Sequence, residues 1–206
     1  MLENPHLLLL VIPILLFSIV IHEMAHGYAA LFLGDPTAKN MGRLTLNPLV
    51  HLDPLWSVLV PTTTMLLGGF FFGMAKPVVY NPRNLRDKKW GEAKIALAGP
   101  VSNMVIALIF VSFIKTFALF GLGSPVLYDA LAIVVIMNIF LAVFNLIPIA
   151  PLDGSKILFA LLKPNQQYIR IWMEQNSFFL LLILLVVLLN TPFLSGFVWW
   201  LSSILI

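Results

Sequence analysis

The chain has 206 residues, of which 60% are hydrophobic and only 10% are charged, and its formal net charge is +3. Because soluble domains carry roughly 25% charged residues, this composition excludes an ordinary soluble protein and predicts an integral membrane protein in a lipid bilayer. It also disfavours nucleic acid as a partner, since no basic stretch lies outside the loops that flank the apolar segments. The sequence has no Cys, so a bound zinc ion must be held by His and carboxylate side chains.

The first apolar segment runs from about Leu7 to Leu33 and is long enough to cross about 30 Å of hydrocarbon. Pro13 falls inside it, which membrane helices tolerate, and Gly34-Asp35-Pro36 is expected to end it. No Lys or Arg precedes the segment, so it lacks the positive region of a signal peptide. We therefore expect a permanent membrane helix.

This segment contains the motif His22-Glu23-Met24-Ala25-His26. Two His four residues apart lie on one face of a helix, so both imidazoles can reach one metal ion. Glu23 projects from a neighbouring position, where its carboxylate can take a proton from a metal-bound water. The alternative is a pair of His satisfied by neighbouring helices, which would need several partners inside lipid. The motif thus predicts a hydrolytic metal site within the membrane.

The segment that follows, residues 37–54, is polar, and the alternation in Arg43–Leu46 favours a short strand. Leu55–Phe72 is apolar again and runs into the glycines of Gly68–Gly73. Glycine permits non-helical backbone, which occurs at membrane depth only where protein or a water-filled cavity covers it. Leu55–Phe72 therefore either re-enters on the side it left or crosses the membrane. Alternatively, the glycines serve packing only.

The most charged stretch, Lys76–Lys94, carries six basic residues against two acidic ones, and the positive-inside rule makes it cytoplasmic. Lys39 and Arg43 favour the same side for the preceding loop, which would require Leu55–Phe72 to re-enter.

Two further crossings are predicted at Ile95–Phe120 and Leu127–Ile147, joined by a short uncharged turn. The basic residues that follow return the chain to the cytoplasmic side. Phe178–Leu189 and Phe193–Ile206 form either a terminal hairpin or one broken helix. We expect an all-α polytopic membrane bundle of about five or six membrane segments, with a small re-entrant or β element between the first two crossing helices. Residues 1–206 are expected to form a single domain.

A catalytic zinc usually takes three protein ligands, and the His motif supplies two. The extension that would place a third His on the same helix is absent, because Phe32 occupies that position. The third ligand is therefore a distant acidic or His residue. The candidates are His6, Asp35, His51, Asp53, Asp87, Glu92, Asp129, Asp153 and Glu174.

Asp153 is the strongest of these candidates. It follows Pro148 and Pro151 at the end of an apolar helix, on the side predicted to be cytoplasmic. Gly154 is expected to loosen the chain so that the carboxylate points back into the bundle. A carboxylate there is costly unless it is paired or metal-bound. The alternative is a helix-end carboxylate at the membrane interface.

With these residues identified, the chain resembles the site-two proteases, a family of intramembrane zinc metalloproteases. The resemblance covers the His motif, the Gly68–Pro77 region, Ala98–Asn103 and Asn145–Gly154, all in family order. Within or beside the last motif, Ala and Ser stand at positions 150 and 155, where Pro and Gly are commoner. The resemblance is closest to compact members without an inserted PDZ-like domain.

The resemblance implies that one Zn²⁺ is held by His22, His26 and Asp153 and that Glu23 is the catalytic base. The family's helper Asn maps to Asn145, as a donor to the substrate or to the oxyanion. For both Asn145 and Asn103 the alternative is helix-to-helix hydrogen bonding. The resemblance also implies that substrate binds as an extended strand near the Gly-rich element.

We therefore predict a zinc metalloendopeptidase that hydrolyses peptide bonds in or near the membrane-spanning segments of proteins, with zinc-activated water and Glu23 as general base. Its partners would be transmembrane proteins or peptides, and its oligomeric state is left open by the sequence. Its location would be the cell membrane, with the active site toward the cytoplasmic side. The alternative is a non-catalytic metal-binding protein, namely an inactive homologue, scaffold or transporter. Retention of Glu23 beside the ligands argues against that alternative.

Overall fold

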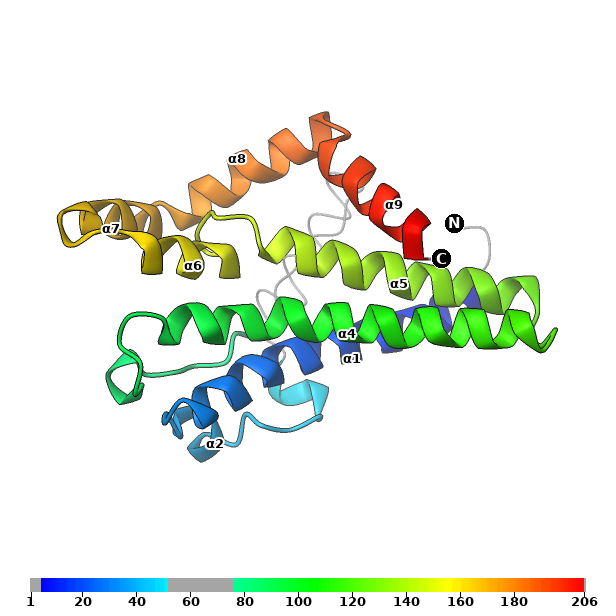
Figure 1. The fold of residues 1–206 in the computed structure, drawn as a ribbon, viewed down its shortest axis with the longest axis horizontal. Helices are drawn as coiled ribbons and strands as arrows, with labels where there is room; N and C mark the ends of the chain where they lie inside the picture. The colour runs from blue at the N-terminus through cyan, green and yellow to red at the C-terminus, as the bar shows by residue number, and fades with distance from the viewer. Residues whose placement is uncertain (1–4, 52–75, 206) are drawn as a thin grey trace.

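The structure is a computed structural model that describes residues 5–51 and 76–205. Three long helices form its centre, α1 (Pro5–Phe32), α4 (Gly91–Leu119) and α5 (Pro125–Asn145) (Figure 1). Each is apolar and long enough to cross a membrane. Helix α4 packs against both α1 and α5, and α1 also contacts α5. The prediction of an α-helical polytopic membrane protein is therefore confirmed.

Local sequence explains where these helices begin and end. At the start of α5, the Ser124 hydroxyl accepts a hydrogen bond from the Leu127 backbone N–H, and Pro125 occupies the first helical position. Beyond the end of α1, Gly34 has a φ of 103°, in the left-handed region that glycine adopts without strain. The helix ends predicted from turn residues are therefore close to those observed.

The chain after α5 forms four shorter helices, α6 (Asp153–Leu161), α7 (Gln167–Gln175), α8 (Ser177–Asn190) and α9 (Phe193–Leu205). The sequence did not predict α6 and α7, which are short and follow proline-rich or polar stretches. The two terminal apolar runs are separate helices that meet at a bend (Figure 1), and α9 packs on α5. Residues 164–175 and α8 are themselves bent by 73°, so they would count as a fourth span only if taken together.

The short strand predicted at Arg43–Leu46 is wrong, because the structure has bends there and no strand in the residues it describes. The segment folds back on itself instead. The Arg43 guanidinium donates to the Val50 carbonyl at 2.6 Å, and His51 Nε2 donates to the Thr45 carbonyl at 2.9 Å. The predictions for Leu55–Phe72 and for the Gly-rich element lie outside the described residues.

The end of α1 and the start of α4 lie at the same end of the molecule, where α2 (Thr37–Asn40) and α6 also lie, and α5 runs toward this end (Figure 1). Residues 76–90 run along this end and bind to α1. The Arg86 backbone N–H donates to the Leu33 carbonyl at 3.0 Å. The N-terminal parts of α4 and the C-terminal part of α1 are therefore held together by a common loop.

Asp35 has none of its surface exposed, and its hydrogen bonds hold this loop in place. Its carboxylate accepts hydrogen bonds from the Thr37 backbone and hydroxyl, the Asn81 backbone and the Asn84 amide. Burial alone would raise the pKa of Asp35, but the hydrogen bonds from Thr37, Asn84 and Asn81 outweigh it and hold that pKa below its ordinary value. Asp35 thus has a structural role, away from the His motif.

Candidate metal centre

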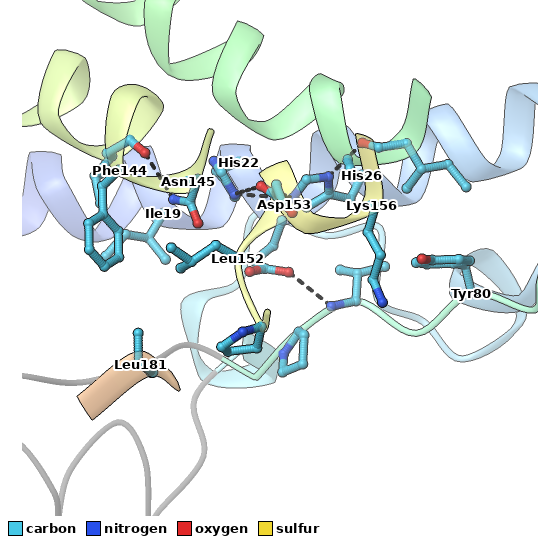
Figure 2. A pocket seen from close by; sticks show the side chains of 17 residues that line it. Ile19, His22, His26, Tyr80, Phe144, Asn145, Leu152, Asp153, Lys156 and Leu181 are labelled. Carbon is cyan, nitrogen blue, oxygen red and sulfur yellow. Dashed lines mark hydrogen bonds and ion pairs between the residues drawn. The ribbon is translucent and has the colours of Figure 1, made fainter. Parts of the chain in front are cut away.

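The structure brings together His22, His26 and Asp153, the three residues predicted as metal ligands (Figure 2). The two His come from adjacent turns of α1, and their Nε2 atoms are 3.1 Å apart. Asp153 is the first residue of α6, and its Oδ2 lies 3.2 Å from His22 Nε2 and 3.3 Å from His26 Nε2. In the part of the chain that the structure describes, this is the one such group of His and acidic residues.

The hydrogen bonds of the two Nδ1 atoms show that the Nε2 atoms of both rings are the ones that face Asp153. His26 Nδ1 lies 2.8 Å from the Ile95 carbonyl, which can only accept, so Nδ1 carries the proton. His22 Nδ1 lies 2.8 Å from Asn103 Oδ1, again an acceptor. When both rings are neutral, as metal binding requires, both Nε2 atoms present lone pairs to Asp153 Oδ2, a buried oxygen without a hydrogen-bond partner among the described residues. Three converging lone pairs repel one another unless a cation lies between them, and His nitrogen with a carboxylate is a zinc donor set.

Gly99 of α4 makes room for the His pair. A Cβ atom at this position would overlap the rings of both His22 and His26. Glycine is therefore required in the Ala98-Gly99-Pro100 motif for steric reasons, since α4 can approach α1 this closely only where position 99 has no side chain.

Gly154 has a different role from the one predicted. A Cβ atom there would overlap the backbone carbonyls of Leu146 and Ile147, so glycine is required for a close approach of two chain segments. The next residue, Ser155, is buried and donates to the Leu152 carbonyl at 2.7 Å. Asp153 is thus presented to the bundle by tight packing and not by a loosened chain.

Glu23 lies beside the metal ligands and is held by a contact that the sequence did not reveal. Its Oε2 accepts a hydrogen bond from the backbone N–H of Val78 at 2.9 Å. Val78 belongs to an irregular stretch before α4. Nothing in the local sequence of Val78 marks it as a partner, because the contact joins residues 55 positions apart.

A cavity of about 320 Å³ opens over the three ligands and Glu23 (Figure 2). Asn145 lines it, and its amide donates to the Leu141 carbonyl at 2.9 Å, one turn earlier in α5. Most of the remaining lining is apolar, with Tyr80 and Lys156 as further polar residues. The cavity is therefore largely apolar, with a few polar groups close to the three candidate ligands.

Among the described residues, none of the other candidates for a third ligand joins this group. The His6 side chain and Asp53 lie outside what the structure describes. Others make bonds elsewhere: His51 to Thr45, Asp87 to Lys94, and both Glu92 and Glu174 to Arg170.

Comparison with known proteins agrees with this geometry. Residues 122–186 match the sequence model of peptidase family M50. The chain is 36% identical over 191 residues to "Putative zinc metalloprotease YwhC" of Bacillus subtilis, an alignment that covers 90% of this chain and 82% of the relative. The chain belongs to peptidase family M50.

Other relatives include "Putative zinc metalloprotease Rip2" of Mycolicibacterium smegmatis, 32% identical over 91% of this chain and 69% of the relative. "Zinc metalloprotease MJ0392" of Methanocaldococcus jannaschii is 30% identical over 76% of this chain and 36% of the relative. No solved structure matches the chain. As an M50 member, of the site-two protease family, the chain is a multi-pass membrane zinc metalloprotease.

Proposed function

We propose that this M50 protease hydrolyses peptide bonds in or near the membrane-spanning segments of proteins, with His22, His26 and Asp153 as zinc ligands. The observation that carries the proposal is the convergence of His22 Nε2, His26 Nε2 and Asp153 Oδ2 inside a helix bundle. His22 lies ten residues before the end of α1, which is about 15 Å along the helix. That depth favours a substrate that is itself in the membrane.

His22, His26 and Asp153 would hold the zinc ion, which would activate a water molecule and polarise the substrate carbonyl when bound. Glu23 is then the general base that accepts the proton from water and passes it to the leaving amine. The bond from the Val78 N–H occupies one oxygen of the Glu23 carboxylate and fixes its direction, so the other oxygen can carry the proton. Asn145 is proposed as a donor to the substrate or the oxyanion, since it lines the same cavity.

The substrates we propose are transmembrane proteins or peptides. The cavity wall includes Ile19, Phe144 and Leu181, which suits apolar side chains of such a segment. Amide groups in a helix are already hydrogen-bonded, so the substrate must unwind locally before its carbonyl can reach the centre. The basic loop before α4 lies at the same end of the bundle as α6, which supports a cytoplasmic location of this end.

The test is Glu23→Gln in purified protein, with bound zinc and cleavage of a membrane-spanning substrate both measured. Zinc content should stay at the wild-type level, because Glu23 is not a ligand, while cleavage should fall by about 10²- to 10⁴-fold. Asp129→Asn is the control, since Asp129 is exposed in α5 and does not line the cavity. Undiminished cleavage by Glu23→Gln would exclude this residue as the base. Wild-type protein that binds zinc but cleaves no membrane substrate would favour a non-catalytic role.

A further inference from the structure

A chain of buried polar side chains leads from His22 across all three central helices. Asn103 of α4 and Asn138 of α5 have none of their surface exposed, and Ser18 of α1 is 1% exposed. His22 Nδ1 contacts Asn103 Oδ1 at 2.8 Å, and the Asn103 amide donates to Asn138 Oδ1 at 3.4 Å. The Asn138 amide in turn donates to Ser18 Oγ at 3.1 Å. Polar groups this deep in a membrane protein are costly unless each is satisfied.

We call the chain His22, Asn103, Asn138 and Ser18 the relay. The direction of each of its hydrogen bonds can be worked out from Ser18, the residue farthest from the candidate metal centre. The Ser18 hydroxyl donates to the Ile14 carbonyl at 3.0 Å, so its oxygen is left to accept from Asn138. Asn138 Nδ2 also lies 2.9 Å from the Val134 carbonyl, which can only accept. The NH₂ group of Asn138 must therefore face Ser18 and Val134, and its oxygen must face Asn103.

The same logic continues to the metal centre. Because the Asn138 oxygen faces Asn103, the NH₂ group of Asn103 must point toward Asn138. The Asn103 oxygen then points toward His22. His22 must then donate from Nδ1, which leaves the lone pair on Nε2. His26 needs no such relay, because its Nδ1 donates directly to the Ile95 backbone carbonyl.

We propose that Asn138 and Asn103 are positioning residues that hold His22 in the tautomer able to bind zinc, although Asn138 does not touch His22. This proposal rests on the ligand set proposed above. Without the oxygen of Asn138, the Asn103 amide is free to turn its NH₂ group toward His22. His22 would then accept at Nδ1 and carry its proton at Nε2, the atom required by the metal.

The deciding variant is Asn138→Leu, which keeps the approximate side-chain volume and removes both polar atoms. Zinc affinity, measured by competition with a chelator, should fall at least about 10-fold, the lower end of the effect of losing an outer partner of a metal ligand. Asn138→Asp should restore the affinity only when its side chain is neutral, because its hydroxyl can then donate to the Val134 carbonyl while its other oxygen accepts from Asn103. Asn190→Leu is the matched control, since Asn190 also donates to the carbonyl four residues earlier but lies in α8, outside the relay.

A second readout separates positioning from general damage to the fold. The protein has four His, so ¹⁵N-His labelling gives few signals. In zinc-loaded wild-type protein, His22 and His26 should both show a slowly exchanging Nδ1–H. Asn138→Leu should speed the exchange of the His22 proton and leave that of His26 unchanged.

Three results would overturn the proposal: an unprotonated Nδ1 on zinc-bound His22, equal effects of Asn138→Leu on both His protons, or unchanged zinc affinity. Failure of His22 Nε2 to shift on zinc loading would overturn the ligand set together with the relay. Neither measurement uses substrate, so a protein that cleaves nothing would contradict the proposed function and leave the relay standing.

Discussion

Gly99 shows how closely single residues are fitted around the centre. The absent side chain lets the backbone of α4 lie against both ligand rings. The space is set by two rigid rings and a helix backbone, so it cannot adjust as a flexible side chain would.

Gly99→Ala should therefore impair the metal centre. The added methyl group displaces the His rings, and we expect at least about a 10-fold loss of zinc affinity, comparable to loss of an outer partner. Gly196→Ala is the matched control, because a Cβ atom at Gly196 meets nothing within 4 Å. There the change should be neutral or stabilising, since alanine is favoured over glycine in a helix by about 1 kcal/mol. Zinc titration of both variants checks this, and equal zinc affinities would contradict the steric role.

At the scale of elements, the Asp35 carboxylate joins the end of α1 to the loop before α4. Asp35 follows α1, while Asn81 and Asn84 flank or belong to the short 3₁₀ helix η3 (Pro82–Asn84). Because the folded state holds the pKa of Asp35 below its ordinary value, ionised Asp35 stabilises the fold.

Asp35→Asn should lower the free energy of unfolding at neutral pH by on the order of 2 kcal/mol, the loss expected at a buried charged acceptor. The thermal midpoint of unfolding in detergent should fall accordingly. The stabilisation by Asp35 is complete above the unfolded-state pKa of about 3.9 and is lost as pH falls through the lower folded-state value. The difference between wild type and variant should thus narrow below about pH 4. If the stability difference between wild type and Asp35→Asn stays constant from neutral pH to below about pH 4, the charge of Asp35 is not responsible for it. Asp129→Asn, at an exposed position in α5, is the control.

The sequence predicted the elements unevenly, for physical reasons. Long apolar runs define α1, α4 and α5, because hydrocarbon thickness imposes their length. The helices α6 and α7 carry no such signature. Helix α6 packs on α4, and Arg170 of α7 forms an ion pair with Glu92 of α4. The pattern at Arg43–Leu46 resembles a strand, but Gly42, with a φ of 66°, turns the chain before it.

The site was predictable to a similar extent. The spacing of His22 and His26 is a local signal, and Asp153 follows from prolines that end an apolar segment. The roles of Asn138 and Val78 depend on which helices and loops meet in space. No local pattern carries that information.

At the scale of the whole molecule, the metal centre joins α1 to α6, which are more than one hundred residues apart in the chain. A ligand that binds only the folded protein stabilises it, by about 4 kcal/mol at a concentration 1,000-fold above the dissociation constant. Zinc should accordingly act as a cross-link between distant segments.

We expect the thermal midpoint of the wild-type protein to rise with free zinc and to fall when a chelator removes it. Asp153→Ala should abolish most of this dependence, because it removes the ligand supplied by α6. Asp87→Ala, which alters an exposed ion pair with Lys94, should retain it. Zinc dependence in Asp153→Ala equal to that of wild type would remove Asp153 from the site.

The three α4 residues that contact His22 and His26 are evenly spaced along the sequence. The Ile95 carbonyl, the bare Gly99 and the Asn103 amide are four residues apart, so they lie on one face of α4, on successive turns. Inserting one residue among them would rotate the following part of the helix by about 100° and turn Asn103 away from His22. Natural changes in chain length should therefore be excluded between positions 95 and 103. They should collect instead in the turn at 121–124, beyond the last residue on which the centre depends.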